Sequence, residues 1–343
     1  MEAQESATMT PRTNVTSGRR CLGLEKTNFR YTPGQLTALR IPTSRRKPSK
    51  RNDIDPEQMA YIANIEWKLS YVTPLYQFRH TQLVLYSKQL SAFIVAEKQK
   101  GIAVEVGPEM GFKVVFSVVH GMTETDEDAE TVFIKIYSKP AFSVEGSAVK
   151  VVWSGWFTCV NGNLDYMRSL PSDFVSLPLF CANGPMSITA LVKSWFTRMF
   201  DCYFGPLSLN SSILQWLAAL WTECHPACNI RYLKLAWNLS TLPPLDISYT
   251  VHPQDAWNLW SSIRQNDSME DSISIEKVRC FMKRVESHFF RHFRMYLSAG
   301  MLTRVCTSLG SAHCDGTIKI TGTHYITPVL MLLTECALLK MPI

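Results

Sequence analysis

Two hydrophobic periods alternate along the chain. Between residues 83 and 99 apolar side chains recur every three or four positions, which predicts an amphipathic helix ended by Gly101. Elsewhere β-branched and aromatic residues gather in short runs bounded by Gly, Pro or acidic residues, a pattern typical of strands. These runs predict strands at residues 102–106, 112–119, 132–137, 149–160, 245–251, 302–312 and 317–321.

Longer helical patterns occupy the rest of the chain. Asp55 followed by Pro56 suits a helix start, so we expect a first helix at residues 55–67. Strand runs followed by helix runs, without regular β-α-β alternation, favour an α+β fold with mainly antiparallel sheets and packed helices. We expect an N-terminal α+β lobe at residues 53–165 and a C-terminal lobe at residues 166–343. Further helices are predicted at residues 186–203, 211–224, 253–263 and 274–297 and after residue 321.

The first 52 residues form a different segment. They are rich in Ser, Thr, Arg, Pro and Gly, and their few apolar residues show no period, so we expect a disordered tail. The tail holds 11 Lys and Arg against 3 Asp and Glu, a net charge of +8, whereas the remainder is −2. A nuclear localisation signal is indicated, with a solvated linker as the alternative. The basic run that indicates it consists of Arg45, Arg46, Lys47, Lys50 and Arg51.

The remaining composition indicates a reduced, soluble protein. No apolar leader precedes the tail, and no apolar run approaches the roughly 18 residues of a membrane span. Ten cysteines are spread singly along the chain. We therefore expect free thiols, most of them small core residues, and no disulfide framework.

Motifs for catalysis or cofactor binding are absent from the sequence. It contains no phosphate loop, dinucleotide-binding glycine motif, nucleophile elbow or zinc-protease helix motif. Cys224, His225 and Cys228 could bind zinc if His313 and Cys314 supplied the second pair, since a structural site needs four ligands. The simpler interpretation is a helix end with buried sulfurs. We therefore expect this protein to have no enzymatic activity and to bind no metal or cofactor. An enzyme with an unrecognised site is an alternative hypothesis.

A basic aromatic segment lies between residues 283 and 294. Val285, Phe289 and Phe293 are spaced i, i+4 and i+8 and are expected to face the core of a helix. Interleaved basic and aromatic residues are typical of nucleic-acid contacts, although a solvated face of a core helix gives the same pattern. The candidate nucleic-acid-facing residues are Lys283, Arg284, His288, Arg291 and Arg294, with His292 beside them.

A second candidate site is the last predicted strand, where apolar and polar residues alternate. If this strand lies at a sheet edge, its free backbone groups can pair with a strand of a partner. The alternative is an internal strand, and the sequence does not separate the two. The candidate partner-binding residues are Thr317, Ile318, Lys319, Ile320 and Thr321.

Several segments of this sequence resemble the centromere protein L family and occur in the same order as in that family, from about residue 53 to the end. The most specific is LSAFIVAEKQKGIAVEVG at residues 90–107. The tail at residues 1–52 carries no resemblance. The other matching words are TPLY (73–76), WSGWF (153–157), LPLFCANG (177–184), FDCYFGPL (200–207), LDISYTVHPQD (245–255), SHFFRHF (287–293) and SAHCDGTIKI (311–320).

The resemblance implies a non-catalytic α+β subunit of the inner kinetochore, in the nucleus at the centromere. Such a subunit forms a heterodimer with centromere protein N, chiefly through its C-terminal part. The pair joins the centromeric nucleosome to other subunits of the constitutive centromere-associated network, and this subunit can line a basic surface that faces DNA. The alternative hypothesis is a direct DNA-binding chromatin protein that uses the basic tail and the 283–294 helix.

Overall fold

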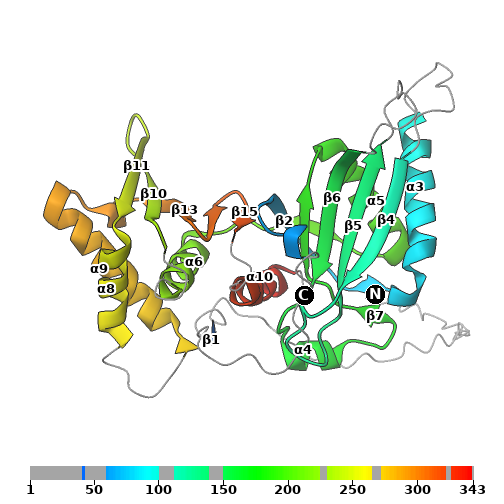
Figure 1. Cartoon of the computed structure of the whole chain (residues 1–343), viewed down its shortest axis with the longest axis horizontal. Helices are drawn as coiled ribbons and strands as arrows, with labels where there is room; N and C mark the ends of the chain where they lie inside the picture. Colours follow the sequence, from blue (N-terminus) through cyan, green and yellow to red (C-terminus); the bar gives the residue numbers. More distant parts are fainter. Residues whose placement is uncertain are drawn as a thin grey trace, which may run out of the picture. The chain divides into compact units, whose positions relative to one another are not determined.

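The computed structural model describes residues 41–42, 59–99, 112–138, 150–224, 230–264, 272–321 and 326–341, all within one compact unit (Figure 1). The helices are α3 (Leu83–Gln99), α4 (Leu164–Ser169), α5 (Met186–Phe200), α6 (Ser211–Glu223), α8 (Pro253–Arg264), α9 (Ile275–Phe293) and α10 (Ile326–Lys340), with short 3-10 turns at His80–Gln82 and Leu297–Ala299. The strands are β1 (Ile41–Pro42), β2 (Glu66–Val72), β3 (Leu75–Tyr76), β4 (Phe112–Val119), β5 (Thr131–Ser138), β6 (Lys150–Thr158), β7 (Phe174–Val175), β8 (Leu179–Asn183), β9 (Phe204–Pro206), β10 (Leu233–Leu239), β11 (Leu245–Val251), β12 (Ser272–Ile273), β13 (Met301–Thr307), β14 (Gly310–His313) and β15 (Thr317–Ile320).

One large sheet runs through the described part of the chain. Its strand order is β11-β10-β13-β14-β15-β2-β8-β6-β5-β4, and β9 also pairs with β2. Each of these pairings is antiparallel. The predicted α+β fold with a mainly antiparallel sheet is therefore confirmed.

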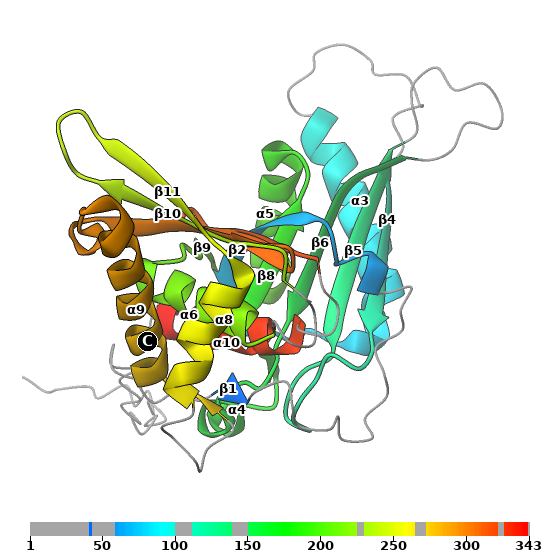
Figure 2. The same ribbon diagram turned by 60° about the vertical axis from the view of Figure 1, so that its left-hand side comes forward.

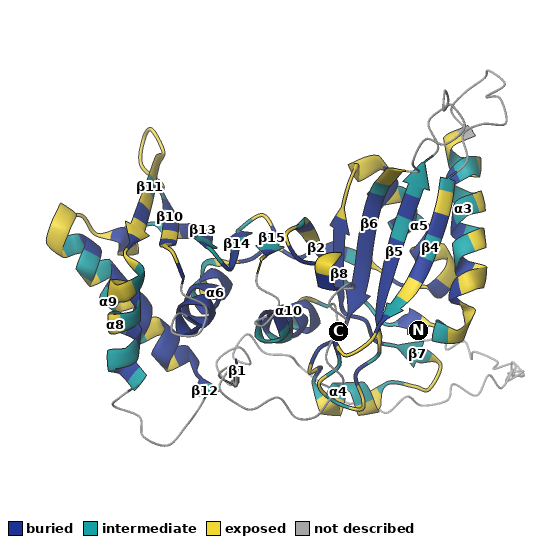
Figure 3. Ribbon diagram, viewed as in Figure 1, coloured by how far each residue is buried: buried dark blue, intermediate teal, exposed yellow. Residues whose placement is uncertain are grey.

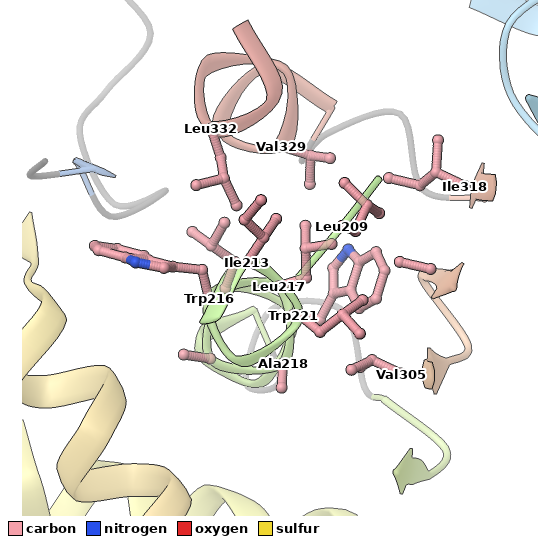
Figure 4. Packing of buried hydrophobic residues seen from close by; sticks show 14 of the residues in the cluster. Leu209, Ile213, Trp216, Leu217, Ala218, Trp221, Val305, Ile318, Val329 and Leu332 are labelled. Atoms are coloured by element: carbon pink, nitrogen blue, oxygen red, sulfur yellow. The ribbon is translucent and has the colours of Figure 1, made fainter. Parts of the chain in front are cut away.

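Two hydrophobic cores lie on opposite faces of this sheet. Leu179 and Cys181 of β8 belong to one core, whereas the intervening Phe180 and Ala182 belong to the other, as the pleat of a strand requires. The first core, here called the α6 core, surrounds α6, whose side chains pack near Val329 and Leu332 of α10 (Figure 4). It also includes side chains from α8 and α9, two helices that contact α6 (Figure 2). The second, the α5 core, lies between the sheet and α3 and α5.

The lobe boundary at residues 165 and 166 stays a prediction. The α5 core draws its buried residues from positions 72 to 202, and the α6 core draws on both ends of the chain as well as on Phe133 and Trp156 of the middle. Helix α10 contacts β2 and β8. The two cores thus share the central strands of one sheet.

The helix predicted at residues 55–67 from the helical spacing of apolar residues is wrong over most of the described part of this range. Of this range, residues 59–67 are described, and the helical backbone there is limited to Met59 and Ala60; β2 begins at Glu66. Trp67 and Leu69 are buried in the α6 core while Glu66 and Lys68 are exposed, so a period of two governs this segment. The predicted strand at residues 302–312 is also two strands, β13 and β14, joined by a turn at residues 308–309.

Most of the predicted tail, including its basic run, lies outside the described residues. The exception is Ile41–Pro42, which forms β1 and pairs with β12. Ile41 is fully buried in the α6 core, so the prediction of disorder is wrong at this position. The physical reason is that one β-branched side chain can be buried in an existing core without periodic neighbours of its own.

No helix in the described ranges is long and apolar enough to cross a membrane. Cysteine burial agrees with the expectation of core thiols at Cys159, Cys181, Cys202, Cys224 and Cys336, which are all buried.

Candidate interaction surface

A sheet of this size exposes two edges, β4 and β11, and the two are not alike. An open edge presents a row of unpaired backbone groups that can template pairing with another chain. At β4, helix α3 closes part of the edge with two serines one turn apart. The Ser87 hydroxyl accepts a hydrogen bond from the backbone N–H of Phe116 at 3.1 Å, and the Ser91 hydroxyl donates to the carbonyl of Phe112.

The opposite edge, β11, has no strand on its outer side among the described residues. Its inner side pairs with β10 along the full strand, from Leu245 opposite Leu239 to Val251 opposite Leu233. Tyr249 of β11 binds the strand to α9: its hydroxyl oxygen lies 2.5 Å from Nδ1 of His288. Burial, and then the charge of Asp255, raise the pKa of Tyr249, so this phenol stays protonated.

Apolar side chains gather beside the β11 edge at the end of α9. Phe293 packs against the Tyr249 ring at 6.0 Å and Tyr296 stacks on Phe290 at 4.4 Å, yet Phe293 is 54% exposed and Tyr296 is 69% exposed. The end of α9 is accordingly coloured as exposed in Figure 3. Exposed aromatic groups beside an open strand are typical of a protein–protein interface. We call the following residues the β11 edge patch: Leu245, Ile247, Phe293, Met295 and Tyr296.

Helix α9 explains why Phe293 is exposed although its spacing predicted a core position. Val285 and Phe289 are buried as predicted. Phe293 is the last residue of α9, and Arg294 then takes a left-handed conformation with φ of 57° that ends the helix. The prediction for Phe293 is therefore wrong, because the helix reaches the edge of the core at this residue.

The predicted nucleic-acid-facing residues of α9 are not equivalent. Lys283, Arg291 and Arg294 are exposed. Arg284 instead lies between helices, where its guanidinium donates to the carbonyl of Leu259 at 3.3 Å and to the hydroxyl of Ser262. With His288 facing Tyr249, two of the five candidate residues serve packing within the fold. A role for the other three toward DNA stays a prediction.

The predicted edge strand, β15, is internal. It pairs with β14 on one side and with β2 on the other, where Ile318 lies opposite Trp67. Ile318 and Ile320 are buried at 2% exposure each. The argument from a free strand edge thus fails, and partner binding by the segment ending at Thr321 remains an untested prediction.

Strand pairing nevertheless brings the polar residues of β15 onto an open face of the sheet. The strand register aligns two rows of side chains across neighbouring strands, opposite to the face that α6 and α9 cover. Four basic side chains lie in these rows: Lys68, Lys234, Arg304 and Lys319. One row is Thr250, Lys234, Cys306, Ser311, Lys319 and Glu66; the other is Ser248, Ala236, Arg304, His313, Thr317 and Lys68.

Acidic residues partly balance this face. Asp315, in the β14–β15 turn, lies 3.1 Å from the Lys68 ammonium and 3.0 Å from Nδ1 of His313. Desolvation raises the pKa of Asp315, but hydrogen bonds from Thr317, Lys68 and His313 outweigh it and hold the pKa well below the usual range. The carboxylate is thus ionised at neutral pH and orients Lys68. Lys234, Arg304 and Lys319 remain the main source of positive charge on this open face.

Sequence reasoning missed the basic rows because they depend on long-range register. Lys68 and Lys234 come from strands that were not predicted. The alternation of Leu and Trp with Lys, Ala and Asn at residues 233–239 was the available signal for β10.

The zinc hypothesis gains no support from the described residues. In these ranges no group of three or more metal-ligating side chains comes together. Cys224 is buried at the end of α6, and its thiol donates to the carbonyl of Leu220 at 3.0 Å. His225 and Cys228 lie outside the described residues.

Comparison with known proteins identifies the family. The family model for Centromere protein L matches residues 61–338. The chain is 61% identical to Centromere protein L of Danio rerio over 351 residues, which covers 100% of this chain and 95% of that relative. It is 44% identical to Centromere protein L of Homo sapiens over 291 residues (84% and 83% covered) and 42% identical to that of Gallus gallus over 299 residues (87% and 86%). The chain therefore belongs to the centromere protein L family.

Proposed function

We propose that this chain is a non-catalytic scaffold subunit of the inner kinetochore. Its family supports a place in the nucleus, at the centromere, and a part in chromosome segregation. In this proposal it forms a heterodimer with centromere protein N, and the pair links the centromeric nucleosome to other subunits of the centromere-associated network.

The observation that carries the proposal is the contrast between the two sheet edges. The α3 serines close part of the β4 edge, whereas the β11 edge stays unpaired among the described residues and is flanked by the β11 edge patch. A partner strand added to β11 would satisfy backbone groups, while the patch would bury its aromatic side chains. Both features belong to the C-terminal part of the chain, as the resemblance implies for the partner surface.

Co-expression with centromere protein N tests this proposal. We expect light scattering to give the mass of a one-to-one complex, compared with 39.0 kDa for the chain alone. Leu245→Asp combined with Tyr296→Asp should abolish the complex, because both substitutions place charge in an apolar interface. Val84→Asp is the matched control, since Val84 is 73% exposed on α3, which packs against the opposite edge strand. A complex that forms unchanged with the double variant would refute the assignment of this surface.

The open basic face favours a second function, direct contact with DNA. Three exposed or half-exposed basic side chains, Lys234, Arg304 and Lys319, lie within four consecutive strands of the sheet, β10, β13, β14 and β15. Phosphate contacts made by such side chains bind DNA without reading its sequence. This surface lies on the opposite side of the sheet from α9, so the two candidate DNA surfaces can be tested separately.

A salt series on the heterodimer decides between these surfaces. Each phosphate contact that is lost should flatten the slope of log K against log salt by about 0.9. If the open face binds DNA, the double variant Lys234→Glu with Arg304→Glu should make the slope less steep. The double variant Arg291→Glu with Arg294→Glu should then leave the slope unchanged. The reverse result would assign DNA contact to α9, and unchanged slopes for both pairs would exclude both surfaces.

A further inference from the structure

We propose that β12 and α10 together form a docking site for a short strand, and that residues 41–42 of this chain occupy it in cis. We call this contact the β1 strap. It attaches the tail at residues 1–52 to the folded body through Ile41, which is distant in sequence from the start of β2. The inference goes beyond the proposed function and does not depend on it.

The backbone of the strap is a minimal antiparallel ladder. Ile41 pairs with Ile273, and Pro42 pairs with Ser272. A two-residue ribbon is not stable on its own in water. Proline also lacks an N–H donor, so the ladder gains little beyond Ile41. Side-chain burial must therefore hold the segment in place.

Ile41 provides that burial. Its side chain is fully buried and belongs to the α6 core together with Ile273 and Ile275. Residues of β1 also contact α10. Ile41 thus shares a core with both elements that β1 contacts, in the manner of an anchor residue of a bound peptide.

Helix α9 holds β12, the strand that pairs with β1, in place. Strand β12 directly precedes the helix, and Ser274, which is buried, is its N-terminal cap residue. The Lys277 ammonium turns back and donates to the carbonyl of Ser272 at 3.0 Å, and Lys277 is itself 7% exposed. This arrangement fixes the β12 backbone from within the body, so β12 does not depend on β1 for its position.

The strap also changes how the chain is connected. After Pro42 the chain returns to the described body at Met59, which is 3% exposed in the same core. Residues 43–58 therefore join two buried positions, whereas a free arm would be attached only at Met59. Release of Ile41 would convert the first arrangement into the second.

The test uses the full chain and hydrogen exchange. Ile41→Asp should raise the exchange rate of the backbone amides at residues 272–275 by at least about tenfold, because a charged side chain cannot be buried in the apolar core that Ile41 occupies. Ile41→Val is the matched control and should retain slow exchange. Strand β6 serves as the internal reference for folding, since it packs in the other core as well. Equal exchange at residues 272–275 in the wild type and in Ile41→Asp would overturn the strap.

Complementation in trans tests the docking site itself. A synthetic peptide with the sequence of residues 36–47 is added to the Ile41→Asp chain, and it should restore slow exchange at residues 272–275. The same peptide carrying Ile41→Asp should not. Failure of the wild-type peptide to protect these amides, while β6 remains protected, would overturn the docking site.

Wild-type proteolysis gives a result that needs no variant. Trypsin should cut the bond after Arg40, next to the strap, at least about tenfold more slowly than the bond after Arg30, because cleavage needs an extended, released segment. Equal rates at the two bonds would refute the strap even if every Ile41 variant failed to fold.

Discussion

A buried carboxylate at the end of α6 should make a large contribution to the stability of the region that carries β11. The Glu223 side chain is 3% exposed, and its Oε1 lies 2.6 Å from Nη1 of Arg264 in α8. Its other oxygen accepts a hydrogen bond from the indole N–H of Trp260, a side chain that is 1% exposed. One carboxylate therefore joins α6 to two positions of α8.

The expected effect follows from what each substitution leaves behind. Breaking a buried ion pair from one side costs about 3–5 kcal/mol, because the remaining charge loses its compensation. Glu223→Ala should therefore lower the free energy of unfolding by about 3–5 kcal/mol. Glu223→Gln keeps the shape and one acceptor, so its loss should be nearer the 1.5–3 kcal/mol, roughly, of one hydrogen bond to a charged group.

Urea unfolding followed by tryptophan fluorescence measures these losses. Arg264→Ala and the double variant complete a cycle, and we expect a coupling of about 0.5–3 kcal/mol between the two residues. A loss below about 1 kcal/mol for Glu223→Ala, or no coupling, would show that desolvation cancels the attraction and would refute the reasoning. Because α8 packs against α9, the same variants should weaken binding at the β11 edge patch more than variants of equal stability in the α5 core.

Three further predictions follow from particular contacts. Ser87→Ala combined with Ser91→Ala should open the β4 edge, lower stability by about 1–3 kcal/mol and promote self-association, seen by light scattering. The depressed pKa of Asp315 contributes stability that is present above the unfolded pKa of about 3.9 and is lost as the pH falls through the folded pKa. The Asp315→Asn chain should therefore lose less stability than the wild type on acidification below about pH 4. Ile318→Asp should unfold the chain, whereas Lys319→Glu should fold normally and weaken only DNA binding; a folded Ile318→Asp chain would contradict the internal position of β15.

Local patterns in the sequence were sufficient for several elements. The helix at residues 83–99 and the strands at residues 112–119 and 245–251 agree with α3, β4 and β11 at both ends. Each of these elements has a single strong period and clear boundaries. At β2 the two periods coexist, since Trp67 fits the helical series from Met59 as well as the strand series with Leu69, and only packing against α6 and β15 decides.

The candidate sites depended much more on long-range pairing. Basic residues on α9 were visible in the sequence, but the contacts of Arg284 with α8 and of His288 with β11 were not. The exposed position of Phe293 depends on where the core ends, which spacing does not encode. Lys234 is 70 positions before Arg304 and Lys319 is 15 positions after it, and the three come onto one face only through the order of β10, β13, β14 and β15.

Strand β15 shows why the position of a strand in a sheet decides its role. Its alternation of polar and apolar residues would be the same at an edge or in the interior, because side chains alternate in both cases. Residues 66–68, about 250 positions earlier in the chain, occupy its outer side. Its isoleucines therefore contribute to the α6 core, while Thr317 and Lys319 face the open side of the sheet. The strand that we propose for pairing with a partner is then β11, and the polar residues of β15 belong to the surface that we propose for DNA.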